Sequence, residues 1–128
     1  MALSDHPLLL VDKSAWVRDA SEVVAEAELC LCAVTRLEIL YSARSGADFS
    51  LIEGDLAAFR DLRIDSATLQ VAAAAQREAA VNGEHRVPIP DLVVAACAQQ
   101  HEAGVLHVDR HFDLLARYLT FEPVRLAV

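Results

Sequence analysis

The stretch Leu-Leu-Leu-Val-Asp at residues 8–12 is a continuous apolar run that ends at an acidic residue. An uninterrupted run of this length predicts a strand that is buried on both faces, as in a parallel sheet. The same arrangement returns late in the chain, where residues 105–109 are Val-Leu-His-Val-Asp. The sequence therefore predicts two buried strands that each end at an acid, Asp12 and Asp109.

Short apolar runs alternate with helical patterns over the rest of the chain. We expect further strands at residues 29–33, 62–65 and 123–128, and helices at residues 14–27, 34–43, 49–62, 67–81, 91–103 and 111–119. This alternation requires βαβ crossovers, so it predicts an α/β fold with a parallel sheet and helices on both faces. No fixed-period repeat or linker interrupts residues 1–128, which are therefore expected to form a single domain.

The composition limits the class of protein. The 128 residues are 55% apolar, which predicts a sizeable core and excludes disorder. The longest apolar run, residues 92–98, is far short of the roughly 18 residues that a membrane span needs. No signal-peptide pattern is present, so we expect a cytoplasmic protein with no membrane partner, and three buried, reduced cysteines.

The net charge of −8 argues against a protein that mainly coats nucleic acid, because such binding relies on Lys and Arg. An acidic chain can still act on phosphodiesters if its carboxylates hold divalent cations, since the ions then supply the positive charge. The positions of the individual acids therefore decide the function.

Three of the acids are expected at one edge of the sheet. Ligands of open α/β sheets bind beyond the carboxyl ends of the strands, where Asp12 and Asp109 are predicted to lie. If their strands are neighbours, the two carboxylates share one crevice. Asp91 follows Pro90 and precedes an apolar run, so it can join them from the start of a helix.

Glu38 is a fourth candidate, on the helix expected at residues 34–43. Val34, Leu37 and Tyr41 form an apolar stripe on that helix, and Glu38 lies beside the stripe at helical spacing. A carboxylate at the border of a buried face costs free energy unless something satisfies it, and a shared cation would do so.

Each acid also has a simpler explanation. Asp12, Asp91 and Asp109 each lie at or just before the start of an expected helix, so each would serve as its N-cap. Glu38, if it has no cation to bind, would instead pair with an arginine. Four carboxylates at one sheet edge would repel one another, however, and no Lys or Arg is close in sequence to all four. Hard carboxylate oxygens, with no His or Cys at ligand spacing, favour Mg²⁺ or Mn²⁺ over Zn²⁺.

Four segments carry a resemblance to a known family. They are Leu-Val-Asp-Lys-Ser-Ala at residues 10–15, Thr-Arg-Leu-Glu-Ile-Leu-Tyr-Ser-Ala-Arg at 35–44, Pro-Asp-Leu-Val-Val-Ala-Ala at 90–96 and His-Val-Asp-Arg-His-Phe-Asp at 107–113. In their order and spacing the chain resembles the PIN-domain ribonucleases, particularly the VapC-type toxins of bacterial toxin–antitoxin pairs. The resemblance runs end to end.

The resemblance implies a sheet ordered 3-2-1-4-5 and a metal-dependent endoribonuclease, whose cation activates water for in-line attack on RNA and leaves 5′-phosphate and 3′-hydroxyl ends. Its catalytic and metal-binding acids would be Asp12, Glu38, Asp91 and Asp109, with Ser14 as a supporting hydroxyl. It also implies a homodimer and a cognate antitoxin whose basic tail enters the acidic crevice.

One departure from the family pattern, at His111, leaves alternatives open. Many relatives carry an acid where this chain has His111, so one or two cations remain possible, and a non-catalytic PIN-like module that binds a basic peptide is the rival function. Asp113 is interpreted as a solvated helix residue, and neither His107 nor His111 is assigned a role. The candidate phosphate contacts are Arg44, Arg86 and Arg110.

Overall fold

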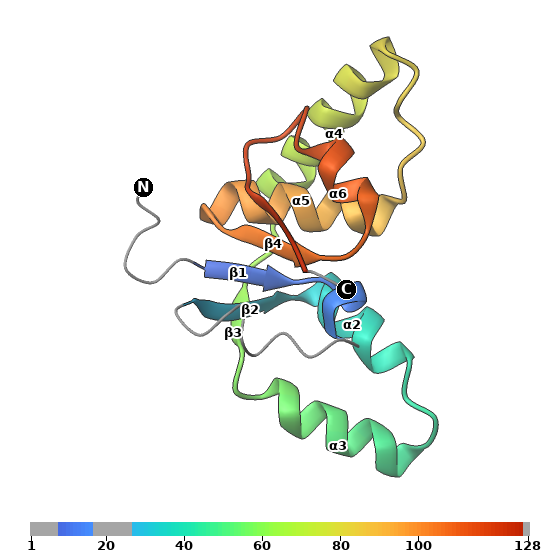
Figure 1. Cartoon of the computed structure of the whole chain (residues 1–128), viewed down its shortest axis with the longest axis vertical. Helices are drawn as coiled ribbons and strands as arrows, with labels where there is room; N and C mark the ends of the chain where they lie inside the picture. The colour runs from blue at the N-terminus through green and yellow to red at the C-terminus, as the bar shows by residue number, and fades with distance from the viewer. Residues whose placement is uncertain (1–7, 17–26, 127–128) are drawn as a thin grey trace.

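A computed structural model describes residues 8–16 and 27–126. Within this part of the chain, five strands form one parallel sheet in the order β3-β2-β1-β4-β5. They are β1 (Leu8–Val11), β2 (Glu28–Cys32), β3 (Arg60–Leu62), β4 (Gly104–His107) and β5 (Pro123–Arg125), and Figure 1 shows β1 between β2 and β4. The expected strand order is confirmed.

The pairing of β1 with β4 places the two predicted strand-end acids side by side. Leu10 pairs with Val105 and Val11 pairs with Leu106, so both strands run out at the same edge of the sheet. The Asp12 amide continues the pairing by donating to the Leu106 carbonyl at 3.0 Å. The condition for a shared crevice is therefore met.

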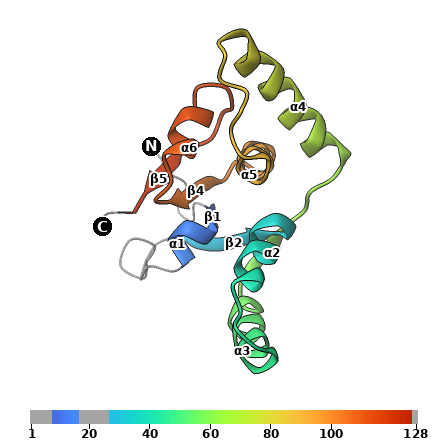
Figure 2. The same cartoon turned by 90° about the vertical axis from the view of Figure 1, so that its right-hand side faces the viewer.

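Helices cover both faces of the sheet, which confirms the three-layer α/β architecture. Figures 1 and 2 show one group on each side of the strands. One face carries α1 (Lys13–Trp16), α2 (Ala33–Tyr41) and α3 (Gly46–Leu56), and the other carries α4 (Ser66–Val81), α5 (Ile89–His101) and α6 (Arg110–Leu115). None of the described helices is long and apolar enough to cross a membrane.

Strand side chains alternate between two apolar cores. Leu10 and Cys30 face the core under α5 and α6, whereas Leu9 and Leu31 face the core under α2. The segment Val94–Ala98 of α5 is wholly buried, because this helix packs against the sheet, α2, α4 and α6. The small side chains of α5 allow this close packing. Because α5 is held on several sides, its first turn has a fixed position.

The three cysteines are free and buried, as expected. Burial raises the pKa of the Cys30 thiol to about 11, which keeps it protonated near neutral pH.

Several predicted boundaries were wrong. The helix expected over residues 49–62 ends at Leu56, because Arg60–Leu62 instead pairs with Cys30–Cys32 as β3, and this strand replaces the one expected at residues 62–65. The last helix ends at Leu115, four residues early. Residues 17–26 of the first expected helix and residues 127–128 of the last expected strand lie outside the described residues.

Gly104 is required by the close approach of β4 to its neighbours. A Cβ atom there would lie 2.9 Å from Leu9 Cδ2 and 3.0 Å from the Glu122 carbonyl oxygen, which already accepts from the Val105 amide. We expect Gly104→Ala to lower the free energy of unfolding by about 1–3 kcal/mol, because the backbone must shift. Urea denaturation of the purified protein measures this.

Gly54→Ala is the matched control. A Cβ atom at Gly54 would meet nothing within 4 Å, and the residue lies inside helix α3. Alanine should therefore stabilise the protein by about 0.5–1 kcal/mol through its higher helix propensity. Equal stability of Gly104→Ala and the wild type would contradict the tight packing at β4.

Candidate metal centre

Asp12 directly follows β1 and is only 4% exposed. Its Oδ2 accepts hydrogen bonds from the Ser14 amide at 3.0 Å and from the Ser14 hydroxyl at 2.6 Å. Ser14 Oγ in turn accepts from the Val108 amide at 3.1 Å, just beyond β4. The Asp12 carboxylate thus accepts an amide of α1 in the manner of an N-cap. Ser14 also links the Asp12 carboxylate to the end of the neighbouring strand β4.

Asp109 and Asp91 come from the starts of two helices. Asp109 is the N-cap of α6, as the capping explanation predicted, and its Oδ1 accepts from the His111 amide at 2.9 Å. Asp91 is the third residue of α5, whose N-cap position is held by Pro88, so the capping explanation for Asp91 was wrong. Its side chain is 11% exposed, and its Oδ2 lies 3.1 Å from His111 Nδ1.

The predicted apolar stripe beside Glu38 was also wrong. Leu37 is 66% exposed and Tyr41 is 89% exposed, whereas the buried face of α2 contains Thr35 and Ile39. Glu38 is half-buried and still borders a buried face, because it lies three residues after Thr35.

Electrostatics show that the predicted acids converge. The pKa of Asp91 is raised to about 7, first by burial and then by the negative charges of Asp12, Asp109 and Glu38, against the opposing effect of His111. The pKa of Glu38 is likewise raised by burial and by Asp12. Asp12, Asp109 and Glu38 therefore lie close enough to Asp91 for each of these three to raise the cost of ionising it, at the edge where β1 and β4 end.

His111 belongs to this cluster and was missed by the sequence reasoning. Its Nδ1 lies 2.8 Å from Asp109 Oδ1 and 3.1 Å from Asp91 Oδ2. Within the described part of the chain, Asp91, Asp109 and His111 offer ligand atoms that all lie within 4.8 Å of one another. The expectation that no His lies at ligand spacing was therefore wrong. The one feature of the sequence that indicates this His ligand is its position two residues after Asp109, the acid that follows a strand.

His107 and Asp113 lie beside the cluster. The fully buried His107 accepts the Asp109 amide on Nδ1 at 3.1 Å, which fixes the backbone at the start of α6. Burial lowers the pKa of His107, so its neutral form is favoured. Asp113 pairs with Arg125 at 3.2 Å and its Oδ1 lies 3.7 Å from His107 Nε2. Its side chain is half exposed, which agrees with its interpretation as a solvated residue.

The candidate RNA contacts Arg44, Arg86 and Arg110 are all exposed, and none forms an ion pair with another described residue.

Trp16 packs edge-to-face on Phe59, with ring centroids 5.9 Å apart. Its side chain therefore contributes to packing.

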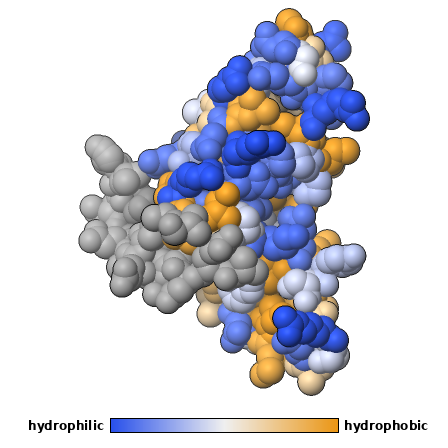
Figure 3. Space-filling model, turned by 45° about the vertical axis from the view of Figure 1, so that its right-hand side comes forward, coloured by the Kyte–Doolittle hydropathy of each residue, from blue (hydrophilic) through white to orange (hydrophobic). Residues whose placement is uncertain are grey.

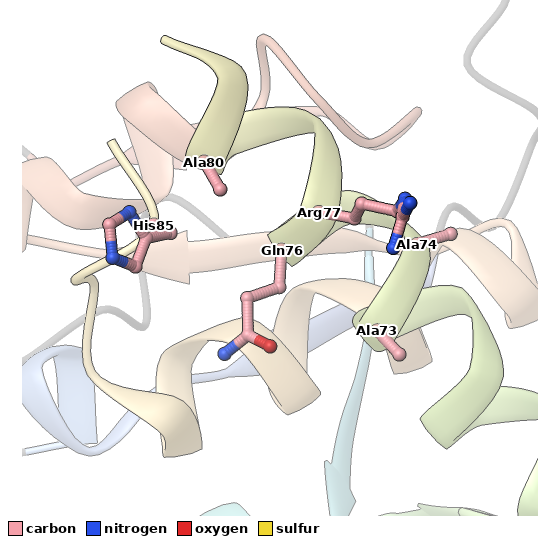
Figure 4. A pocket seen from close by; sticks show the side chains of 6 residues that line it. All are labelled: Ala73, Ala74, Gln76, Arg77, Ala80 and His85. Atoms are coloured by element: carbon pink, nitrogen blue, oxygen red, sulfur yellow. The ribbon is translucent and has the colours of Figure 1, made fainter. Parts of the chain in front are cut away.

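A separate hollow of about 490 Å³ lies along α4 and the loop that follows it. Figure 4 shows its lining residues, Ala73, Ala74, Gln76, Arg77, Ala80 and His85. It contains none of the predicted site residues.

The acidic edge fits a divalent cation. The donors are carboxylate oxygens, the ligands that hard divalent cations prefer. They are partly or fully desolvated, and among the described residues it is His111 that opposes their combined charge at Asp91. A cation would relieve a repulsion that the described residues leave in place.

The raised pKa of Asp91 predicts a stability cost in the metal-free protein. Because this pKa is about 7 when folded and lower when unfolded, stability is lost as pH rises from about 4 to about 7. In EDTA at pH 8 we therefore expect Asp91→Asn to be more stable than the wild type by at least about 1 kcal/mol, since one pKa unit corresponds to about 1.4 kcal/mol. Urea denaturation at pH 4 and pH 8 measures it, and the two proteins should converge at pH 4. A less stable variant at pH 8 would contradict the convergence of charges.

Residues 9–118 match the family model of the PIN domain. Ribonuclease VapC17 of Mycobacterium tuberculosis is 38% identical over 114 residues, which cover 84% of this chain and 86% of that protein. Ribonuclease VapC18 of the same species is 36% identical over 129 residues, covering 92% and 93%. The crystal structure of VapBC-5 from M. tuberculosis superposes with a TM-score of 0.77 at 22% identity, over 93% of this chain and 98% of that one, which shows a shared fold.

Proposed function

The chain belongs to the PIN-domain family and, within it, to the VapC ribonucleases, and we infer from this that it is an endoribonuclease that acts as the toxin of a toxin–antitoxin pair. The observation that carries this function is the convergence of Asp12, Asp91, Asp109 and Glu38 at the carboxyl edge of β1 and β4. Residues 1–128 form one PIN-like domain in this proposal.

The four acids hold a divalent cation, Mg²⁺ or Mn²⁺, and Ser14 supports them. When bound, the cation supplies the positive charge that activates water and stabilises the charge developing on the phosphate. Ser14 fixes one oxygen of Asp12 through two hydrogen bonds, so the other oxygen stays available for a ligand. The burial of Asp12 and Asp91 strengthens every charge interaction at the site.

RNA must approach this site although the protein and the RNA both carry net negative charge. A net charge of −8 repels a polyanion, so local cations must attract the phosphates. Arg44, Arg86 and Arg110 are exposed and are proposed to make these contacts, with Arg110 next to Asp109 in the chain.

The antitoxin partner is proposed to cover apolar surface and to neutralise the acidic edge. Leu37 and Tyr41 on α2 and Leu51 on α3 are all more than 60% exposed. Figure 3 shows apolar patches interspersed with hydrophilic surface over the face it presents. A basic tail is complementary to the carboxylates, and a homodimer would bury further apolar side chains.

The test is RNA cleavage by purified protein freed of antitoxin, with Mg²⁺ or Mn²⁺ and with EDTA. We expect cleavage of structured RNAs only with divalent ions, and products that a 5′-phosphate-dependent exonuclease degrades. No cleavage over a broad RNA panel, together with no ion binding in calorimetry, would refute the nuclease in favour of an interaction module that binds a basic peptide.

A further inference from the structure

The imidazole of His111 lies against both carboxylates of the tightest cluster in the described residues. Its Nδ1 is 2.8 Å from Asp109 Oδ1 and 3.1 Å from Asp91 Oδ2, and its side chain is 34% exposed. The Asp109 carboxylate also accepts the backbone amide of His111 at 2.9 Å. This turn at the start of α6 fixes the ring over the acids, so its position is built into the backbone.

The spacing of these atoms matches the coordination of one small cation. Two ligands that each lie about 2.1 Å from an ion, at right angles to each other, are about 3.0 Å apart. The two separations from His111 Nδ1 lie on either side of that value. Neutral Nδ1 has a lone pair for a metal, and the proton then sits on Nε2.

We propose that His111 Nδ1 is a direct ligand of the divalent cation, together with Asp91 and Asp109, and that this nitrogen makes the site select Mn²⁺ over Mg²⁺. The inference rests on the proposed function, because it concerns the cation of that same site. It adds a ligand outside the predicted acidic quartet and a preference among ions.

The preference follows from ligand chemistry. Mg²⁺ prefers oxygen ligands and keeps several of its waters, whereas imidazole nitrogen suits transition-metal ions. Mn²⁺ accepts both nitrogen and carboxylate oxygen, so a mixed set of one imidazole and two carboxylates favours it. Replacing the nitrogen with oxygen should therefore remove much of the discrimination between the two ions.

His111 has one competing role with the same distances. A protonated Nδ1 would donate hydrogen bonds to Asp91 and Asp109 and hold them in place without touching the ion. The two roles differ in one measurable property, since only a ligand nitrogen is bonded to the metal. Electron spin-echo modulation of bound Mn²⁺ detects such a ¹⁴N nucleus directly.

The experiment titrates Mn²⁺ into the full-length, antitoxin-free protein and competes it with Mg²⁺, without RNA. The variants are His111→Asp, which supplies oxygen, His111→Asn, which is a weaker ligand of similar reach, and His85→Ala. His85 is exposed and lines the α4 hollow, so it is a matched histidine control. Circular dichroism verifies that each variant is folded.

We expect ¹⁴N modulation in the wild type and in His85→Ala, and its loss in both His111 variants. We also expect His111→Asp to lower the ratio of Mn²⁺ to Mg²⁺ affinity about tenfold or more, the scale on which metal sites respond to altered ligation. Unchanged modulation or an unchanged affinity ratio in folded His111→Asp would overturn the proposal.

The failure of this proposal can be told apart from failure of the nuclease. If Mn²⁺ binds without ¹⁴N modulation and the protein still cleaves RNA, His111 is not a ligand and the endoribonuclease stands. If neither ion binds and no RNA is cleaved, both proposals are refuted. The wild-type spectrum alone decides the ligation if both variants are unstable.

Discussion

Asp12→Asn is expected to lower the rate of RNA cleavage at least about 100-fold while the protein stays folded. The substitution keeps the size of a side chain that is almost fully buried, and it removes the negative charge that a cation needs. Loss of one electrostatic contact at a catalytic centre typically costs factors of 100 to 1,000. Cleavage of a defined RNA with Mn²⁺ under single-turnover conditions measures the loss.

Asp113→Asn is the control for this prediction. It makes the same chemical change one helical turn after Asp109, at a half-exposed carboxylate that pairs with Arg125. We expect its cleavage rate to stay within about twofold of the wild type, because surface pairs contribute little. Equal losses in both variants would show that general negative charge matters, rather than the place of Asp12 in the cluster.

Phe112→Ala is expected to lower the free energy of unfolding by about 3–5 kcal/mol. Phe112 is fully buried and its ring packs on that of His107, with centroids 5.2 Å apart. The expected loss is a large part of the 5–15 kcal/mol by which domains are typically stable. It should also loosen α6, which carries Asp109 and His111. Urea denaturation gives the size of the effect.

Phe49→Ala removes the same ring from a side chain that is 40% exposed on α3. Phe49 buries less apolar surface in the folded protein than Phe112 does. We therefore expect Phe49→Ala to lower the free energy of unfolding clearly less than Phe112→Ala does. A Phe112→Ala variant as stable as Phe49→Ala would mean that α6 is not anchored by its aromatic contact.

The sequence supported the sheet well, because its strongest signals are local. Leu8–Val11 and Gly104–His107 are apolar runs with few alternatives to a buried strand, and the acids that follow them lie where strands end in parallel sheets. The order of the strands is not local information. It came from the family resemblance, and the pairing of β1 with β4 confirms it.

The face of α2 could not be predicted from periodicity. The helix has two candidate faces for the core, one through Leu37 and Tyr41 and the other through Thr35 and Ile39. Helical spacing identifies stripes but does not say which one meets the sheet. The choice depends on how the chain leaves β2, which places Thr35 against Cys32 through hydrogen bonds to its backbone.

The role of His111 was missed for a different reason. The direction of a side chain in the first turn of a helix depends on the cap, and here the Asp109 carboxylate holds the His111 amide. That contact turns the imidazole toward Asp91, which is twenty residues away in the chain. β3 was likewise misplaced, because the helical pattern of residues 49–62 lost to strand pairing with β2.

The placement of β4 beside β1 has a consequence for how a cell makes this protein. Leu9 pairs with Gly104, so the centre of the sheet closes only after most of the chain has been translated. Asp12 and Glu38 leave the ribosome early, but their partners Asp91 and Asp109 follow much later, and such long-range closure is intrinsically slow. A nascent chain that still lacks β4 therefore cannot assemble the cluster of four carboxylates, and any activity of this site begins only after synthesis is nearly complete.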